Sequence, residues 1–206
     1  MAIHYLALGD SYTIGTGTST ESRNFPGHLA RKLEEVTGHR VQLRNPAVDG
    51  YTTLDLIRTE LGEVDRFRPD LVTILIGAND IVQGVDEVTY RSRIAEIYGK
   101  VKALALPPGR VVTLSIPDFS NVPMAPTFGE PLHIRARIDR FNEAAREEAL
   151  SHGFDYLDLS DLSRSGAARA GWVAADGLHP GDAQYEAWSQ LIWKAVAERW
   201  TVQSTE

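Results

Sequence analysis

The sequence predicts an α/β protein built on a parallel sheet of about five strands, with helices covering both faces. Short apolar segments alternate about five times with segments whose apolar residues recur every three or four positions. The segment 70–76 is almost wholly apolar, which is typical of a parallel strand that is buried on both faces. Repeated alternation of strand and helix favours right-handed crossovers, so a single sheet sandwiched by helices is expected.

Five apolar segments are expected to form the strands of this sheet. The first ends at Gly9, and the second ends near the dipeptide Asn45-Pro46, which favours a turn. The third and the fourth are apolar along almost their whole length, as buried strands are. In chain order, the expected strands are 3–8, 41–44, 70–76, 111–116 and 154–159.

Five helices are expected between and after these strands. The first begins at Asn24-Phe25-Pro26 and ends at Gly38, because Asn and Pro favour a helix start and Gly favours a helix end. Thr52 or Thr53 is expected to cap the second helix. In chain order, the expected apolar faces are Leu29, Leu33 and Val36; Leu54, Ile57 and Leu61; Tyr90, Ile94, Ile97, Val101 and Leu104; Ile134, Ile138, Phe141 and Ala145; and Trp188, Leu191, Ile192, Ala195 and Val196.

Composition narrows the class of protein. The 206 residues suffice for a well-buried core, and without an internal repeat or a linker they are expected to form one domain, 1–206. The net charge of −7 argues against nucleic acid or an anionic membrane surface as a partner, because both favour a basic patch. The absence of cysteine excludes disulfides, thiolate zinc sites and a cysteine nucleophile. We see neither a signal peptide nor a long apolar run, so a cytoplasmic protein without a membrane span is expected.

Four short polar blocks follow four of the expected strands. The blocks are 9–12 (GDSY), 48–51 (VDGY), 77–80 (GAND) and 176–180 (DGLHP). In a parallel sheet the carboxyl ends of the strands share one edge, and open α/β folds bind their ligands there. We therefore expect Ser11, Gly50 and Asn79 to meet Asp176 and His179 at this edge.

These residue types are the parts of a hydrolytic site. A serine hydroxyl needs a base within hydrogen-bonding reach, and His179 is the candidate base for Ser11. Asp176, three residues earlier on the same loop, is expected to orient the imidazole and to stabilise the imidazolium that forms. The backbone N–H groups of Ser11 and Gly50 and the Asn79 side-chain amide are the expected donors of an oxyanion hole. The predicted reaction is therefore ester hydrolysis through an acyl-serine intermediate.

The blocks, taken in order, resemble those of the SGNH hydrolase superfamily, also called GDSL-type esterases. The residues that carry the resemblance are Gly9-Asp10-Ser11-Tyr12, with Tyr in place of Leu, then Gly50, Gly77-x-Asn79-Asp80 and Asp176-x-x-His179. The resemblance implies a flavodoxin-like three-layer α/β/α sandwich, no metal or organic cofactor, and hydrolysis of carboxylic esters or thioesters. The Gly-x-Ser-x-Gly elbow of the α/β-hydrolases is absent, because Thr13 stands in the place of the second Gly.

The expected partner is a small-molecule ester with a short-to-medium acyl chain. The same machinery leaves open a carbohydrate deacetylase, an acyl-thioesterase or a lysophospholipase. A non-catalytic flavodoxin-like binding module is the alternative from another class, and it predicts that Ser11 and His179 lie far apart. The sequence leaves the oligomeric state open.

Two longer irregular segments, 118–130 and 160–175, are candidates for the walls of a pocket, because loops of this length in a compact domain are often functional. The apolar residues of these segments that either line a pocket or pack in the core are Phe119, Met124, Phe128, Trp172 and Val173. The tryptophans of the last helix are expected to form either a contact surface or part of the core.

Overall fold

The computed structural model describes residues 2–166 and 169–202, and its centre is a five-stranded parallel sheet. The strand order is β2-β1-β3-β4-β5, which is the order of flavodoxin-like folds and confirms the predicted class. The order reverses between β1 and β3, and this switch point is where such sheets bind ligands. The strands are β1 (Ile3–Gly9), β2 (Val41–Arg44), β3 (Leu71–Leu75), β4 (Val111–Leu114) and β5 (Asp155–Leu157).

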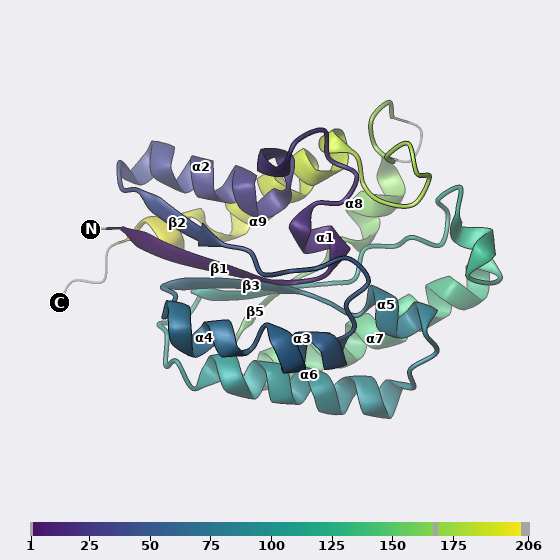
Figure 1. The fold of residues 1–206 in the computed structure, drawn as a ribbon, viewed down its shortest axis with the longest axis horizontal. Coiled ribbons are helices and arrows are strands. Elements are labelled where there is room, and N and C mark those ends of the chain that lie inside the picture. The colour runs from purple at the N-terminus through teal and green to yellow at the C-terminus, as the bar shows by residue number, and fades with distance from the viewer. Residues whose placement is uncertain (1, 167–168, 203–206) are drawn as a thin grey trace.

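Helices cover both faces of the sheet (Figure 1). One face is covered by α2 (Phe25–Thr37) and α9 (Asp182–Thr201), which pack against each other. The other face is covered by α3 (Thr53–Thr59), α4 (Gly62–Phe67), α6 (Glu87–Lys102) and α7 (Pro131–Ser151). Short helices follow the strands or lie within the connections: α1 (Ser11–Ile14), α5 (Ala78–Val82), α8 (Ser160–Ser165), and the 3-10 helices η1 (Glu21–Arg23) and η2 (Ala125–Thr127). In the described part of the chain, no helix has the length and apolarity needed to span a membrane.

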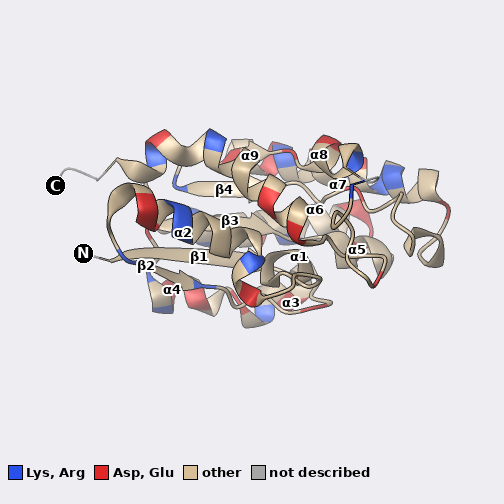
Figure 2. Ribbon diagram, turned by 90° about the horizontal axis from the view of Figure 1, so that it is seen from above, with Lys and Arg blue, Asp and Glu red and all other residues tan. Residues whose placement is uncertain are grey.

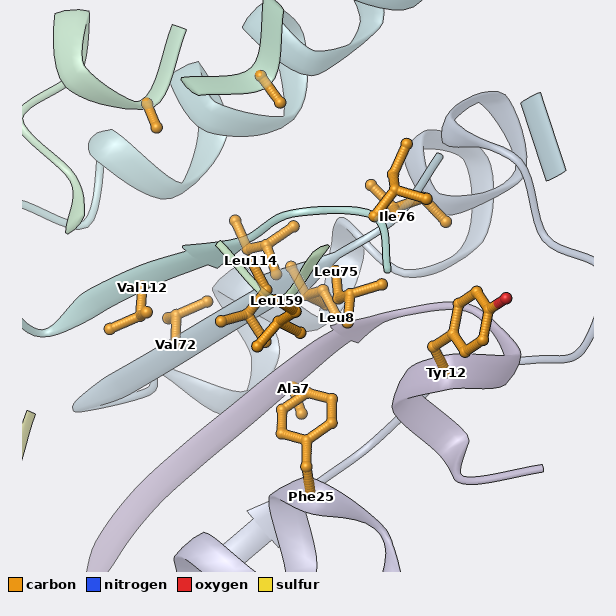
Figure 3. Packing of buried hydrophobic residues seen from close by; sticks show 14 of the residues in the cluster. Ala7, Leu8, Tyr12, Phe25, Val72, Leu75, Ile76, Val112, Leu114 and Leu159 are labelled. Atoms are coloured by element: carbon orange, nitrogen blue, oxygen red, sulfur yellow. The ribbon is translucent and has the colours of Figure 1, made fainter. Parts of the chain in front are cut away.

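The central strands are buried because both of their faces are covered. β1, β3 and β4 contain no Lys, Arg, Asp or Glu, and Figure 2 shows the charged residues on the helices and loops. Phe25 of α2 points at Ala7 of β1 on one side of the sheet (Figure 3). The polar pair Tyr5 and Thr73, on neighbouring strands, satisfies its hydroxyl groups with a 2.8 Å hydrogen bond between them.

The predicted caps of α2 are confirmed. The Asn24 side chain accepts a 2.7 Å hydrogen bond from the Gly27 N–H, and Gly38 ends the helix with a left-handed φ of 69°. Leu29 and Leu33 are buried, whereas Val36 is exposed, because the last turn of the helix extends beyond the sheet-facing stripe.

The predicted second helix is divided in two, and its buried face differs from the prediction. α3 begins with Thr52 as N-cap, as predicted, but it ends at Glu60, and Leu61 already precedes α4. The residues of α3 that face the interior are Thr53, Leu56 and Glu60, all almost fully buried. Of the predicted apolar face, Leu61 is buried in the core and Ile57 packs against it, and Leu54 is only partly buried.

The last helix is buried along one stripe of its surface. Trp188, Ile192, Val196 and Trp200 lie in the core, and the Trp200 indole donates a 2.9 Å hydrogen bond to the Gly109 carbonyl. Leu191 and Ala195, which were expected on the buried face, are exposed, because they lie one position before the buried stripe at each turn. Trp188 and Trp200 are therefore core residues and not a contact surface.

Candidate active site

The first polar block forms a tight turn at the end of β1. Asp10 caps α1, and Ser11 is the first residue of this helix, only 6% exposed. A Cβ atom at Gly9 would overlap the Leu75 carbonyl oxygen of β3 and the Thr13 side chain, so only glycine fits this position. The turn therefore presses the start of α1 against the ends of β1 and β3, at the switch point of the sheet.

The last block holds its histidine by a dense set of hydrogen bonds. Asp176 Oδ2 lies 2.6 Å from His179 Nδ1, and Asp176 Oδ1 accepts the backbone N–H groups of Leu178 (2.9 Å) and His179 (3.0 Å). Burial by itself would raise the pKa of Asp176, but these hydrogen bonds outweigh it, and the pKa is lowered. The carboxylate is thus held in its charged form beside the ring. With Nδ1–H donating to this carboxylate, the other ring nitrogen, Nε2, is left with a lone pair.

Contacts between the two ends of the chain bring these blocks together. A Cβ atom at Gly17 would meet the Pro180 carbonyl oxygen and the Cβ of His179. The segment after α1 therefore lies directly against the loop 176–180, here called the histidine loop. The Tyr12 ring makes an edge contact with the His179 ring, with 6.0 Å between centroids. The Tyr185 hydroxyl of α9 donates a hydrogen bond to the Thr16 carbonyl. The structure therefore places the turn that carries Ser11 and the loop that carries His179 side by side.

The second and third blocks are joined to each other. Gly50 lies on an exposed turn with a left-handed φ of 80°, and a Cβ atom there would meet nothing within 4 Å. The left-handed backbone conformation explains why glycine stands at this position, and the space next to its Cα is open. Asn79, the second residue of α5, donates a 2.9 Å hydrogen bond from Nδ2 to the Tyr51 carbonyl. One hydrogen of the Asn79 amide is thereby used, and its second hydrogen is free to bind another acceptor.

Asp80 and Asp10 brace these loops through hydrogen bonds to the backbone. Asp80 accepts the Thr53 N–H (2.8 Å) and the Thr53 hydroxyl (2.6 Å), which ties α5 to the start of α3. Asp10 accepts the Tyr12 N–H at 3.0 Å. Both carboxyl groups are fully buried. Asp80 therefore connects the loop of Asn79 to the segment that follows Gly50, whereas Asp10 holds the turn of Ser11 from within.

One cavity of about 250 Å³ opens between these loops. Four of the predicted site residues line it, and Asp176 stands behind His179 through the hydrogen bond described above. Phe119 and Phe128, in an edge contact with 6.3 Å between centroids, form an aromatic wall. The residues that line the cavity are Ser11, Tyr12, Asp49, Gly50, Ala78, Asn79, Val82, Phe119, Phe128, Leu178 and His179.

The two long loops contribute unequally to this cavity. Phe119 and Phe128 line it, whereas Met124, Trp172 and Val173 do not. Trp172 is buried and donates a 3.1 Å hydrogen bond from its indole to the Ser163 carbonyl. The loop 118–130 also supports the segment that carries His179, because the Met124 N–H donates a 3.0 Å hydrogen bond to the Gly177 carbonyl.

Four residues that line the cavity were not predicted from the sequence. Tyr12, Ala78, Val82 and Leu178 line the cavity, and each stands within three residues of a predicted site residue. Their nearness to the blocks was the available signal. Among residues 2–166 and 169–202, no group of three or more His, Asp or Glu side chains could hold a metal ion.

Comparison with known proteins gives consistent matches. The model of the GDSL-like Lipase/Acylhydrolase family matches residues 7–187. A GDSL-like esterase of Mycobacterium tuberculosis is 29% identical over 212 residues, which cover 97% of this chain and 63% of that protein. A lipase of Streptomyces rimosus is 26% identical over 193 residues, or 77% of this chain and 70% of the lipase. The crystal structure of a lipase/acylhydrolase from Enterococcus faecalis has a TM-score of 0.78 at 22% identity, with 99% of both chains covered.

Proposed function

Since the chain belongs to the GDSL-like Lipase/Acylhydrolase family, we propose that it hydrolyses carboxylic esters, with Ser11 as nucleophile, His179 as base and Asp176 as the residue that orients the base. The observation that carries this proposal is the arrangement at the cavity. His179 shares the cavity with Ser11, and its far ring nitrogen is hydrogen bonded to Asp176. Both features support the proposal, because a serine nucleophile needs a nearby base whose ring is held in orientation.

The reaction begins with addition of the Ser11 hydroxyl to the ester carbonyl. A bond forms from Ser11 Oγ to the carbonyl carbon, and the hydroxyl proton passes to His179 Nε2. When the bond to the alcohol oxygen breaks, the imidazolium returns this proton to the leaving alcohol, and the acyl group stays on Ser11. Water then adds to the acyl carbonyl and gives its proton to His179. The bond from the acyl carbon to Ser11 Oγ breaks, the imidazolium returns the proton to Ser11 Oγ, and the acid is released. The Asp176 carboxylate stabilises the imidazolium in both halves of the reaction.

Three N–H donors are proposed to stabilise the oxyanion that each addition creates. The Ser11 N–H lies at the first position of α1, where a helix has no internal acceptor for it. No described residue accepts a hydrogen bond from the Gly50 N–H, and the Asn79 amide keeps one hydrogen for the oxyanion. Donors that are already in place need little rearrangement as charge develops on the carbonyl oxygen.

The cavity favours short-to-medium acyl chains. Its volume of about 250 Å³ is small, and its walls beyond the polar donors are Phe119, Phe128, Val82 and Leu178. Such walls bind a hydrocarbon chain through the hydrophobic effect, and the limited volume favours a short one. This chain spans 63% of the length of the mycobacterial esterase that it matches.

The proposal is tested with p-nitrophenyl acetate, butyrate, octanoate and palmitate, using the wild-type protein and Ser11→Ala. We expect hydrolysis of the shorter esters, and loss of nearly all of this activity in the variant. A fluorophosphonate should label Ser11 and no other residue, as located by mass spectrometry. Equal rates for the two proteins, or no label on Ser11, would defeat the proposal. Acetylated xylose and acyl-CoA substrates, assayed in parallel, distinguish the deacetylase and thioesterase alternatives.

A further inference from the structure

Three buried carboxyl groups lie around the turn that carries Ser11. Glu60, the residue that ends α3, accepts the Gly9 N–H with Oε2 at 3.0 Å. Asp10 accepts the Tyr12 N–H, and Asp80 accepts the Thr53 N–H. Each carboxyl thus holds a backbone N–H in or beside one of the loops that carry the proposed oxyanion donors. All three are almost completely inaccessible to solvent.

Among the residues that the structure describes, only Asp80 of these three carboxyl groups forms an ion pair. Asp80 forms a 3.3 Å ion pair with Arg93 of α6 and accepts two hydrogen bonds from Thr53. Within the described ranges, no Lys, Arg or His forms an ion pair with Asp10 or Glu60. One oxygen of each, Asp10 Oδ2 and Glu60 Oε1, is buried without a hydrogen-bond partner among the described residues. An unpaired carboxylate in such a place is strongly disfavoured, so the neutral acid is the favoured form.

The electrostatic surroundings act in the same direction. Burial raises the pKa of Asp10 to about 8; the Tyr12 hydrogen bond opposes this rise, and the charges of Asp80 and Asp49 add to it. Burial likewise raises the pKa of Glu60 to about 8, against the Gly9 hydrogen bond, and the charge of Asp10 adds to the rise. The titratable groups that interact with this pair are Asp49 of the Gly50 turn, Asp80 of α5, Tyr12 of α1, Tyr90 of α6 and Tyr185 of α9.

We propose that Asp10 and Glu60 are positioning residues that work as neutral carboxylic acids beneath the serine turn. This inference rests on the proposed ester hydrolysis. Glu60 fixes the Gly9 N–H and Asp10 fixes the Tyr12 N–H, so Ser11 is held between two anchored neighbours. The transition state gains negative charge on the carbonyl oxygen nearby, and a further buried negative charge would oppose it. Ionisation of either acid is therefore expected to lower kcat.

The first test distinguishes the hydrogen-bond acceptor of the Glu60 side chain from the volume that this side chain fills. Glu60→Gln keeps an oxygen that accepts the Gly9 N–H and has no proton to lose, so kcat at pH 7 should fall no more than about five-fold. Glu60→Leu has a similar volume but no acceptor, and kcat should fall at least about ten-fold, because a buried N–H loses its partner. Far-ultraviolet circular dichroism establishes that both variants are folded. Equal kcat values for the two variants would overturn the positioning role.

The second test uses the pH profile of kcat between pH 6 and 10, which a merely structural role would not change. In the wild-type enzyme kcat should decline with apparent pKa values near 8, which belong to the coupled pair. Asp10→Asn and Glu60→Gln should each shift this decline to higher pH, and the double variant should lose it. A wild-type profile that stays flat to pH 10, or a double variant with the wild-type decline, would overturn the proposal.

A measurement that does not depend on catalysis completes the test. Difference infrared spectra between pH 7 and pH 10 should contain the C=O stretch of buried protonated carboxyl groups, and this band should weaken in Asp10→Asn and in Glu60→Gln. An absent band at pH 7 would refute the neutral acids. Because the band is measured without substrate, a failure of ester hydrolysis itself would be recognised separately, by unlabelled Ser11 together with an intact band.

Discussion

The hydroxyl of Tyr185 on α9 donates a 3.0 Å hydrogen bond to the carbonyl of Thr16, which stands just after the serine turn. The same hydroxyl lies 3.4 Å from the Ser11 carbonyl oxygen. Tyr185 is fully buried, so these contacts are protected from water. Helix α9 thereby fixes the position of α1. The loop that carries His179 leads directly into α9.

Tyr185→Phe should lower both stability and activity. The ring and its packing remain, but two backbone carbonyls lose a donor, so the free energy of unfolding should fall by about 1 kcal/mol. We expect kcat to fall several-fold, because Ser11 and His179 are less firmly aligned. Tyr156→Phe is a matched control, since Tyr156 donates a similar 3.1 Å hydrogen bond to the Asn142 carbonyl, away from the cavity. Urea unfolding and p-nitrophenyl butyrate hydrolysis measure the two effects, and equal activity losses in both variants would contradict the alignment argument.

Asp176→Asn should lower kcat by about 10³–10⁴-fold without unfolding the protein. The amide cannot hold the His179 ring in the tautomer that leaves Nε2 free, and it cannot stabilise the imidazolium. Asp161→Asn provides a control of the same chemistry, because Asp161 is an exposed carboxylate that pairs with Arg164 on α8. Steady-state kinetics with circular dichroism measure the outcome. Loss of less than about ten-fold in kcat would argue against the proposed role of Asp176.

Asn79→Ala should lower kcat by about 10²–10³-fold, with a much smaller effect on KM, because it removes a donor to the oxyanion. It also removes the hydrogen bond to the Tyr51 carbonyl, so the Gly50 turn loses a contact. Asn79→Asp is the informative companion, since it keeps the shape of the side chain but replaces the donor by an acceptor. A larger kcat for Asn79→Asp than for Asn79→Ala would contradict donation by this side chain.

Phe128→Ala should shift the preferred acyl chain to greater length. Removing the ring enlarges the cavity on the side of its aromatic wall. The value of kcat/KM for the octanoate ester, divided by that for the acetate ester, should therefore rise by about ten-fold. Leu132→Ala is the control, because Leu132 is a large apolar residue, 78% exposed, only four positions further along the chain. A chain-length series of p-nitrophenyl esters measures the shift. An unchanged ratio in Phe128→Ala would show that the acyl chain does not contact this wall.

Between about pH 5 and 8 the wild type should lose stability relative to Glu60→Gln. The unfolding free energy of the variant minus that of the wild type should therefore increase with pH. The folded-state pKa of Glu60 is raised, so in this range the native protein binds a proton that the unfolded chain releases. Native stability from this group is therefore complete at low pH and is lost as the pH rises through about 8, at up to roughly 1.4 kcal/mol per pH unit. Urea unfolding of both proteins at four pH values measures the difference. A constant difference would contradict the raised pKa.

The strands and the long helices could be predicted because each carries a signal within its own sequence. Leu71–Leu75 is buried throughout, and the caps of α2 are local residues, Asn24 and Gly38. The gathering of Ser11, Gly50, Asn79 and His179 at one cavity follows from a general rule about carboxyl ends of parallel strands. Their chemical roles are still predictions.

Other features could not be predicted because their signal lies outside the local sequence. The short helices α1, α5 and α8 are less than two turns long, so no apolar period identifies them. Glu60 faces the interior although a charged residue at a helix end normally faces water, and only the packing of α3 against the serine turn reveals this. The aromatic wall depends on how the loop around Phe119 and Phe128 folds back on itself, which no periodicity describes.

The parallel order of the strands also has a consequence for synthesis of the protein. Ser11 leaves the ribosome well before the loop with His179 and the helix that holds the serine turn in place. If the proposed roles are right, a nascent chain lacks its base until the segment after β5 has been synthesised. Fragments that terminate before His179 should therefore show no ester hydrolysis.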